Sequence, residues 1–494
     1  MNLWKFDLTQ YASVWSVAVN VGLLLIALLI GNALRRLIPF LRKAFIPSAL
    51  IGGLLLFLAN LFTGHVLGFS LIDARLMQII TYHALAVGFI AMSLKSVEKV
   101  KNSKKGLRSV QNGLLTGGTY MLQAVVGLGV SILFYLVGTG LFYDSGVILP
   151  LGFGQGPGNA LTWDINFTDY GFDGGGSFGL TLASIGFIVA SVVGVLYINY
   201  YKRKGLIKER RSERVRMVSD FEDNNEIDDC ESVDKTSVQV AFVAVAYALS
   251  FGIMCFFAKL TDWTGVKLFN DIAWGFNFIW GVITATLIRS LMRALEKRRV
   301  VRQKYINNYQ MDRISGFAFD MMIIAGVAAI DIKVVAKYAW VIAILCAVGA
   351  IVTLFYVRMI CRRCFKGFEH EAFLVNFGTL TGTASNGMIL LREIDPDYVT
   401  PTSGIFILSQ FPATLAVAPL LLLLNMSARS FKGCLIALAI FFVLFAAYTT
   451  VLFVTSRRSK DAAADAETAE TEEAEATVSL PDTGADSDPR TQIL

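Results

Sequence analysis

The sequence predicts an all-α polytopic membrane protein with two inverted five-helix repeats, a re-entrant hairpin in each repeat and one extra C-terminal transmembrane helix. Three observations predict this fold. Of the 494 residues, 55% are apolar and 17% are charged, and the mean hydropathy is +0.58, values outside the range of soluble globular domains. The apolar residues form helix-length segments. Two motifs of the first half recur in the second half.

About eleven segments each supply the roughly 20 apolar residues that cross a hydrocarbon layer of about 30 Å as a helix. The first segment is full length and no small-residue cleavage site follows it, so we expect a retained helix rather than a signal peptide. The expected spans lie near residues 15–34, 45–63, 77–97, 112–139, 177–200, 236–259, 270–290, 314–332, 338–357, 402–425 and 431–455.

These spans predict an organisation into two repeats with additions. In chain order we expect the first repeat (1–201, with a hairpin at about 149–171), a charged cytoplasmic linker (202–235), the second repeat (236–430, with a hairpin at about 375–396), the extra helix (431–455) and a cytoplasmic tail (456–494). The tail is rich in Ala, Glu, Asp and Thr and has few bulky apolar residues. This composition predicts disorder.

Lysine and arginine fall on alternate connections, after spans 1, 3, 5, 7 and 9. The positive-inside rule therefore predicts an N-terminus outside the cell and a C-terminus in the cytoplasm. Because the basic residues cluster at helix ends, the net charge of +6 indicates topology and not a nucleic-acid partner. The six cysteines are scattered and predict no disulfide framework.

Two pairs of short motifs relate the halves of the chain. GFIAMSLK (88–95) aligns with GVAAIDIK (326–333), and FGQGPGNA (153–160) aligns with FGTLTGTA (377–384). An odd number of spans per repeat forces the second copy to cross the membrane in the opposite direction. Inverted repeats with a binding site where they meet are typical of secondary transporters.

The second motif pair lies in glycine-rich segments that separate apolar spans. Such a segment is either a surface loop or a hairpin that reaches into the protein, because irregular backbone facing lipid costs several kcal/mol per polar group. If the two hairpin tips meet, their backbone groups and neutral side chains face a solute. The side chains that would supply donors and acceptors are those of Gln155, Asn159, Thr379, Thr381, Thr383, Ser385 and Asn386.

Charged residues near membrane depth are costly and often mark a transport pathway. Arg392, late in the second segment, either binds a substrate carboxylate or pairs with Glu393 or Asp395 at the base of the hairpin. Asp320, early in the eighth span, either binds a coupling cation or proton or is solvated or ion-paired near the cytoplasmic end. Asn159 and Thr383 are further candidates for a Na⁺ ligand.

The stretches IPSALIGGLLL (46–56) and FGTLTGTASNGMILLREIDPD (377–397) resemble the sodium:glutamate symporter family over roughly residues 10–430. The resemblance implies Na⁺-coupled uptake of an acidic amino acid by a homodimer that works by an elevator-type movement. The binding residues that it implies are Gly154, Gly158, Asn159, Gly378, Thr381, Gly382, Thr383, Ser385 and Asn386. The first hairpin, GFGQGPG, and the ending LLREIDP depart from better-known members and suggest a divergent branch.

The sequence therefore favours a multi-pass transporter of the cell membrane that binds a small carboxylate and Na⁺ and needs no cofactor. One alternative is a cation- or proton-coupled carrier of another organic anion, such as a di- or hydroxycarboxylate. A second alternative is a membrane enzyme or receptor. The sequence contains three histidines and lacks the HExxH motif, which disfavours an enzyme.

Overall fold

The computed structural model describes residues 11–95, 103–162, 167–168, 170–207, 235–266, 268–300, 305–396 and 399–478. These residues form helices and contain no β-strand. Ten of the described helices are long and apolar enough to cross a membrane, which confirms a polytopic α-helical protein. The candidate spans are Trp15–Leu37, Ser48–Leu67, Ala74–Leu94, Lys105–Leu136, Gly175–Arg203, Thr236–Thr264, Asn277–Lys297, Ile332–Cys364, Gln410–Arg429 and Phe431–Arg457.

Helix α13 accounts for the difference between the eleven spans that the sequence predicts and these ten. The span predicted near residues 314–332 forms this helix, Asn308–Ala328, but it is not among the ten. This helix is too polar to count as a candidate span, because it contains three charged residues, Asp312, Arg313 and Asp320. Residues 321–329 of this segment are buried, so other helices rather than lipid cover much of its C-terminal half.

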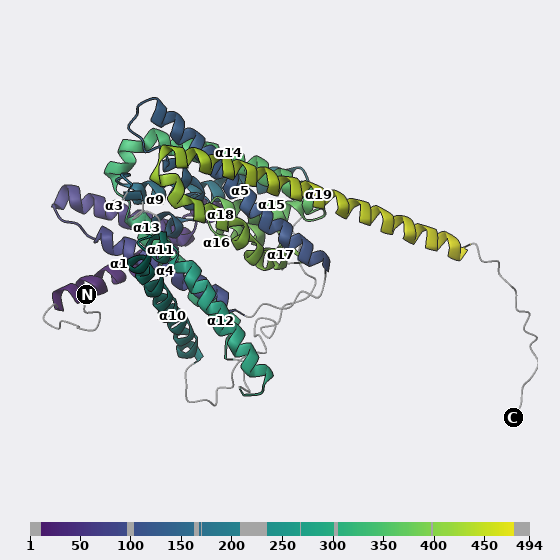
Figure 1. The fold of residues 1–494 in the computed structure, drawn as a ribbon, viewed down its shortest axis with the longest axis horizontal. Coiled ribbons are helices and arrows are strands. Elements are labelled where there is room, and N and C mark those ends of the chain that lie inside the picture. Colours follow the sequence, from purple (N-terminus) through teal and green to yellow (C-terminus); the bar gives the residue numbers. More distant parts are fainter. Residues whose placement is uncertain are drawn as a thin grey trace, which may run out of the picture.

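The helices pack into two bundles (Figure 1). The α4 bundle contains α1 (Tyr11–Leu37), α2 (Pro39–Lys43), α3 (Ser48–Phe62), α4 (Ala74–Leu94), α10 (Lys235–Thr264), α11 (Leu268–Gly275), α12 (Asn277–Lys297) and α13. The α5 bundle contains α5 (Ser103–Leu136), α6 (Ile148–Gly152), α7 (Pro157–Thr162), α9 (Gly175–Arg203), α14 (Ile332–Cys364), α15 (Glu369–Leu380), α16 (Ala384–Arg392), α17 (Thr402–Leu408), α18 (Gln410–Arg429) and α19 (Phe431–Val478). The bundles join where α7 and α9 pack on α4 and α13.

Corresponding elements follow one another in both halves of the chain. Helices α4 and α13 are each 21 residues long, and each begins after a side-chain cap, Asp73 in α4 and Asn307 in α13. Such caps satisfy the free N–H groups of a first turn. The next helices, α5 with 34 residues and α14 with 33, each lead into one of the glycine-rich segments.

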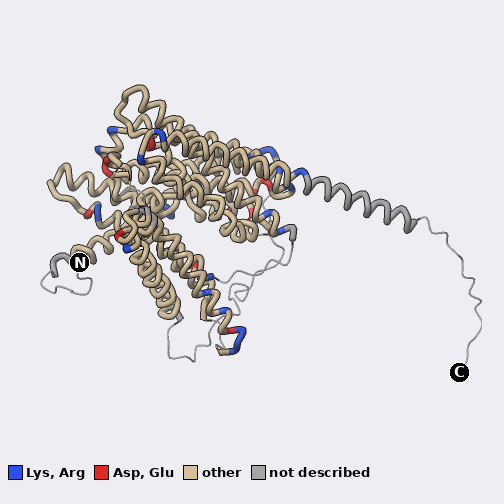
Figure 2. The backbone as a smooth tube through the Cα atoms, in the orientation of Figure 1, with Lys and Arg blue, Asp and Glu red and all other residues tan. Residues whose placement is uncertain are grey.

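Lysine and arginine lie mostly near the ends of helices (Figure 2). Examples are Arg35 and Arg36 in the last turn of α1 and Arg362 and Arg363 in the last turn of α14. Basic side chains at a helix C-terminus also interact favourably with the helix dipole. Helix α19 continues to Val478, past residue 455, where we expected the extra span to end. The rest of the predicted tail, 479–494, and residues 208–234 of the linker lie outside the described residues.

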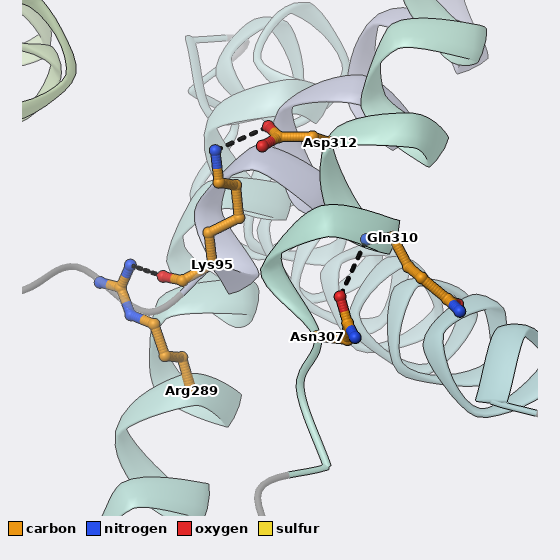
Figure 3. Close-up of polar contacts among 5 residues, drawn as sticks. All are labelled: Lys95, Arg289, Asn307, Gln310 and Asp312. Atoms are coloured by element: carbon orange, nitrogen blue, oxygen red, sulfur yellow. Dashed lines mark hydrogen bonds and ion pairs between the residues drawn. The ribbon is translucent and has the colours of Figure 1, made fainter. Parts of the chain in front are cut away.

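The last turn of α4 is held by two basic side chains (Figure 3). Arg289 of α12 donates from Nη1 to the carbonyl oxygens of Ser93 and Lys95, at 2.8 and 3.0 Å. Lys95 Nζ pairs with Asp312 Oδ1 of α13 at 2.6 Å. The end of α4 therefore lies beside the start of α13, so these two central helices run antiparallel.

We expect Arg289→Ala to destabilise the α4 bundle. The change leaves carbonyl groups of the last turn of α4 without a charged donor, a loss of about 1.5–3 kcal/mol. The melting temperature of the purified protein checks this prediction. Arg298→Ala, which removes an exposed side chain just past the end of α12, is the control. Equal melting temperatures for both variants would contradict the role of Arg289.

Candidate solute site between two helical hairpins

Each glycine-rich segment contains two short helices joined by a non-helical break. In the first, α6 ends at Gly152 and α7 begins at Pro157, whose fixed φ suits the first position of a helix. Gly156 between them has a φ of +94°, a conformation that glycine adopts without strain. In the second, α15 ends at Leu380 and α16 begins at Ala384. Both segments are thus broken helices.

The two breaks lie against each other inside the protein. A Cβ atom on Gly156 would be 3.3 Å from Thr383 Cγ2 and 3.7 Å from the carbonyl oxygen of Gly382. Thr381 is 0% exposed, and Pro157 is buried. We call the contact region of residues 153–156 and 381–383 the tip junction.

Helix α9 covers one side of the tip junction. A Cβ atom on Gly186, near the middle of α9, would be 2.5 Å from the carbonyl oxygen of Thr381 and 2.8 Å from that of Phe153. Both tips therefore approach α9 at a residue without a side chain. Only glycine allows two carbonyl groups this close to a helix backbone.

Side chains of α5 and α14 hold the other side of the tip junction. Tyr120 of α5 donates from its hydroxyl group to the carbonyl oxygen of Gly154 at 2.9 Å. Gln123, one helical turn further on, donates from Nε2 to the carbonyl oxygen of Leu380 at 3.0 Å and to Thr353 Oγ1 of α14 at 2.8 Å. Helix α5 therefore bonds to the backbone of both hairpins.

Several polar atoms at the tip junction are buried and lack a hydrogen-bond partner among the described residues. They are Gln123 Oε1, Gln155 Nε2, Thr383 Oγ1, and Nδ2 and Oδ1 of Asn386. Each such atom costs about 1–3 kcal/mol, and most buried polar groups in proteins are satisfied. The set contains both donors and acceptors. A polar ligand bound at the junction would satisfy them.

The junction carries no formal side-chain charge, since residues 153–156 and 381–383 are all neutral. Helix α16 starts there, and its cap residue, Thr383, makes no side-chain cap bond. The first N–H groups of a helix without such a cap attract an anionic group. The N-terminus of α16 is therefore suited to a carboxylate.

The structure places six of the predicted binding residues at the tip junction or in contact with it, and Thr381 is one of them. Gln155 and Thr383 carry unpartnered atoms there. Gly154 lies beside Gln123, and Gly382 lies beside Asn386, whose Nδ2 would be 2.6 Å from a Cβ on Gly382.

Other predicted residues lie at helix contacts or bond to their own helix. Gly158 packs against Leu85 of α4 and Met322 of α13, and Gly378 packs against Gly387 where α15 crosses α16. Thr379 and Thr381 donate their hydroxyl groups to carbonyl oxygens one turn earlier in α15, at 2.7 Å each. The two hydroxyl oxygens can still accept from a ligand.

The remaining predicted residues lie further from the junction or face outward. Asn159 is buried in α7, and Ser385 is exposed on α16. Arg392 is exposed at the last residue of α16, about 12 Å from the start of that helix by helical rise. Asp320 is partly buried on α13, in the α4 bundle.

Sequence reasoning missed Tyr120, Gln123, Thr353 and Gly186. Their helices are long and apolar and contain no glycine-rich break, which was the signal that identified the hairpins. Gln123 alone had a usable signal, because it is an amide within the apolar run YMLQAVV, and polar residues in membrane helices are often functional.

Comparison with protein-family models decides the class of protein. The model described as sodium/glutamate symporter matches residues 15–385, which is more than half of the chain and includes both tips. The chain belongs to the sodium/glutamate symporter family. The family is one of transporters, so this protein is a multi-pass membrane transporter and not an enzyme. The match ends before Asn386 and Arg392. A search of curated proteins found no match.

Proposed function

We propose that this sodium/glutamate symporter family member takes up glutamate or a related acidic amino acid together with Na⁺ and binds them at the tip junction. The observation that carries the proposal is the group of unpartnered buried atoms on Gln123, Gln155, Thr383 and Asn386. A neutral junction with unsatisfied donors and acceptors suits a carboxylate and a cation bound side by side, since it holds neither ion permanently.

The fold supports an inverted repeat and an elevator-type movement as parts of this proposal. Helices α4 and α13 match in length and capping and run antiparallel, as inversion requires. Both hairpins belong to the α5 bundle, and that bundle joins the α4 bundle through α7 and α9. A movement of the α5 bundle against α4 and α13 would carry the junction, with its ligands, from one side of the membrane to the other.

Further parts of the proposal rest on the sequence and the family. The charge pattern supports an N-terminus outside the cell and a C-terminus in the cytoplasm. The family supports a homodimer in the cell membrane. Coupling follows if Na⁺ at the junction raises the affinity for the substrate, because the two ligands then favour moving together.

Transport by the purified protein tests the proposal. Vesicles that contain the full chain should accumulate labelled glutamate when an inward Na⁺ gradient is imposed, and replacement of Na⁺ by choline should abolish the accumulation. Protein-free vesicles are the control. Glutamate uptake that ignores Na⁺ would overturn the assignment of the coupling ion.

A carrier of another organic anion is the second candidate, because no charged side chain of the tips selects an amino acid over a di- or hydroxycarboxylate. The same vesicles distinguish the two. Uptake of a hydroxycarboxylate driven by a pH gradient, without uptake of glutamate or aspartate, would favour this candidate.

A further inference from the structure

Gln123 connects the two hairpins through a single amide group. Its side chain is 0% exposed. Nε2 is bonded to the carbonyl oxygen of Leu380 in the second hairpin. Oε1 lies on the side of the first hairpin, 2.6 Å from the position that a Cβ on Gly154 would take. The amide thus spans the tip junction from one tip to the other.

The orientation of this amide is fixed by its partner. The carbonyl oxygen of Leu380 can only accept a hydrogen bond, so the nitrogen of Gln123 must face it. The opposite orientation would place two acceptor oxygens against each other. Oε1 is therefore the atom that faces the first hairpin, where it is buried without a partner.

An acceptor such as Oε1 can be satisfied only by a hydrogen-bond donor or a cation. The hydroxyl group of Tyr120 already bonds to Gly154. Gln155 Nε2 lies in the first tip but is itself unpartnered, so it does not bond Oε1. Because the tips contain no basic side chain, a cation beside Oε1 would meet no repulsion from them.

We propose that Gln123 Oε1 is a ligand of the compact cation carried with the substrate, either Na⁺ or the ammonium group of the amino acid. The assignment deepens the proposed function and rests on it. An amide oxygen binds a cation without fixing a counter-charge, so the cation can be released in each cycle. The other end of the amide holds the second tip, so a cation at Oε1 is linked directly to the position of Leu380.

Gln123→Met tests the assignment, since methionine has a similar length and volume but no strong acceptor. The melting temperature of the full chain is measured without substrate, in NaCl against choline chloride at constant ionic strength. If Oε1 binds Na⁺, the variant should need about tenfold more Na⁺ for half of the stabilisation. If Oε1 binds the ammonium group, this Na⁺ dependence stays unchanged and the affinity for glutamate at saturating Na⁺ falls about tenfold.

Gln239→Met is the matched control. Gln239 of α10 is also 0% exposed, but both its amide atoms are bonded, to the carbonyl oxygen of Tyr305 at 2.6 Å and to the N–H of Asn307 at 3.0 Å. This variant should melt earlier and keep the wild-type responses to Na⁺ and glutamate.

The assignment is overturned if Gln123→Met behaves like Gln239→Met, with a lower melting temperature and unchanged affinities for Na⁺ and glutamate. Gln123 would then only hold the tips together. A wild-type protein that transports no acidic amino acid would refute the proposed function instead. The Na⁺ titration needs no substrate, so it tests the role of Gln123 as a Na⁺ ligand independently of transport.

Discussion

Gly186→Ala should reduce transport to background. A methyl group at this position would lie 2.5 and 2.8 Å from carbonyl oxygens of Thr381 and Phe153, one from each hairpin. Both are backbone atoms, so neither can turn away as a side chain would. The tips must separate from α9, which distorts the junction and costs about 1–3 kcal/mol in stability. Na⁺-driven uptake in vesicles and the melting temperature measure the two effects.

Gly252→Ala is the control for this substitution. Gly252 lies within α10, and a Cβ atom there would have no neighbour within 4 Å. Alanine also favours a helix over glycine, so uptake should equal that of the wild type. If Gly186→Ala transports as well as Gly252→Ala, the tips do not rest on α9 in the working protein.

Asn386→Leu should abolish uptake without lowering the stability of the substrate-free protein. Both amide atoms of Asn386 are buried and unpartnered, and the side chain is 4% exposed. Replacing unsatisfied polar atoms with an apolar side chain of similar size is neutral or stabilising. Ligands that need these atoms then lose their partners. The melting temperature and glutamate uptake are measured on the same preparation.

Asn376→Leu in the first arm of the same hairpin is the comparison. Asn376 Nδ2 donates to Asn112 Oδ1 at 2.7 Å and to the carbonyl oxygen of Ala372 at 2.8 Å, so its loss should lower the melting temperature. A decrease of similar size in Asn386→Leu would mean that Asn386 has a structural role, contrary to our proposal.

Much of the fold could be predicted from the sequence, because helix length and apolarity are local properties. Ten of the expected spans are helices that meet both requirements. The eleventh, α13, contains three charged residues and does not meet them, and its C-terminal half is covered by other helices. A window of hydropathy treats every helix as if lipid surrounded it. Burial by neighbours that are distant in the chain relaxes this requirement.

The candidate site, like the fold, could be predicted only in part from the sequence. Glycine-rich breaks between apolar spans marked both hairpins, and Gln155, Thr383 and Asn386 were predicted from those segments. Their neighbours Gln123 and Gly186 could not be found by that signal, because each lies within a regular helix. Nothing local records that α5 and α9 flank the point where the tips meet.

The sequence by itself determined that the chain is a helical membrane protein, that it belongs among transporters and that its helices are broken at two glycine-rich segments. Composition, helix length and turn chemistry act over a few residues, so a linear pattern carries them. Only the tertiary structure decided that the two tips contact each other, and which of their polar atoms are left without partners. Those properties depend on groups brought together from α5, α9, α14 and both hairpins.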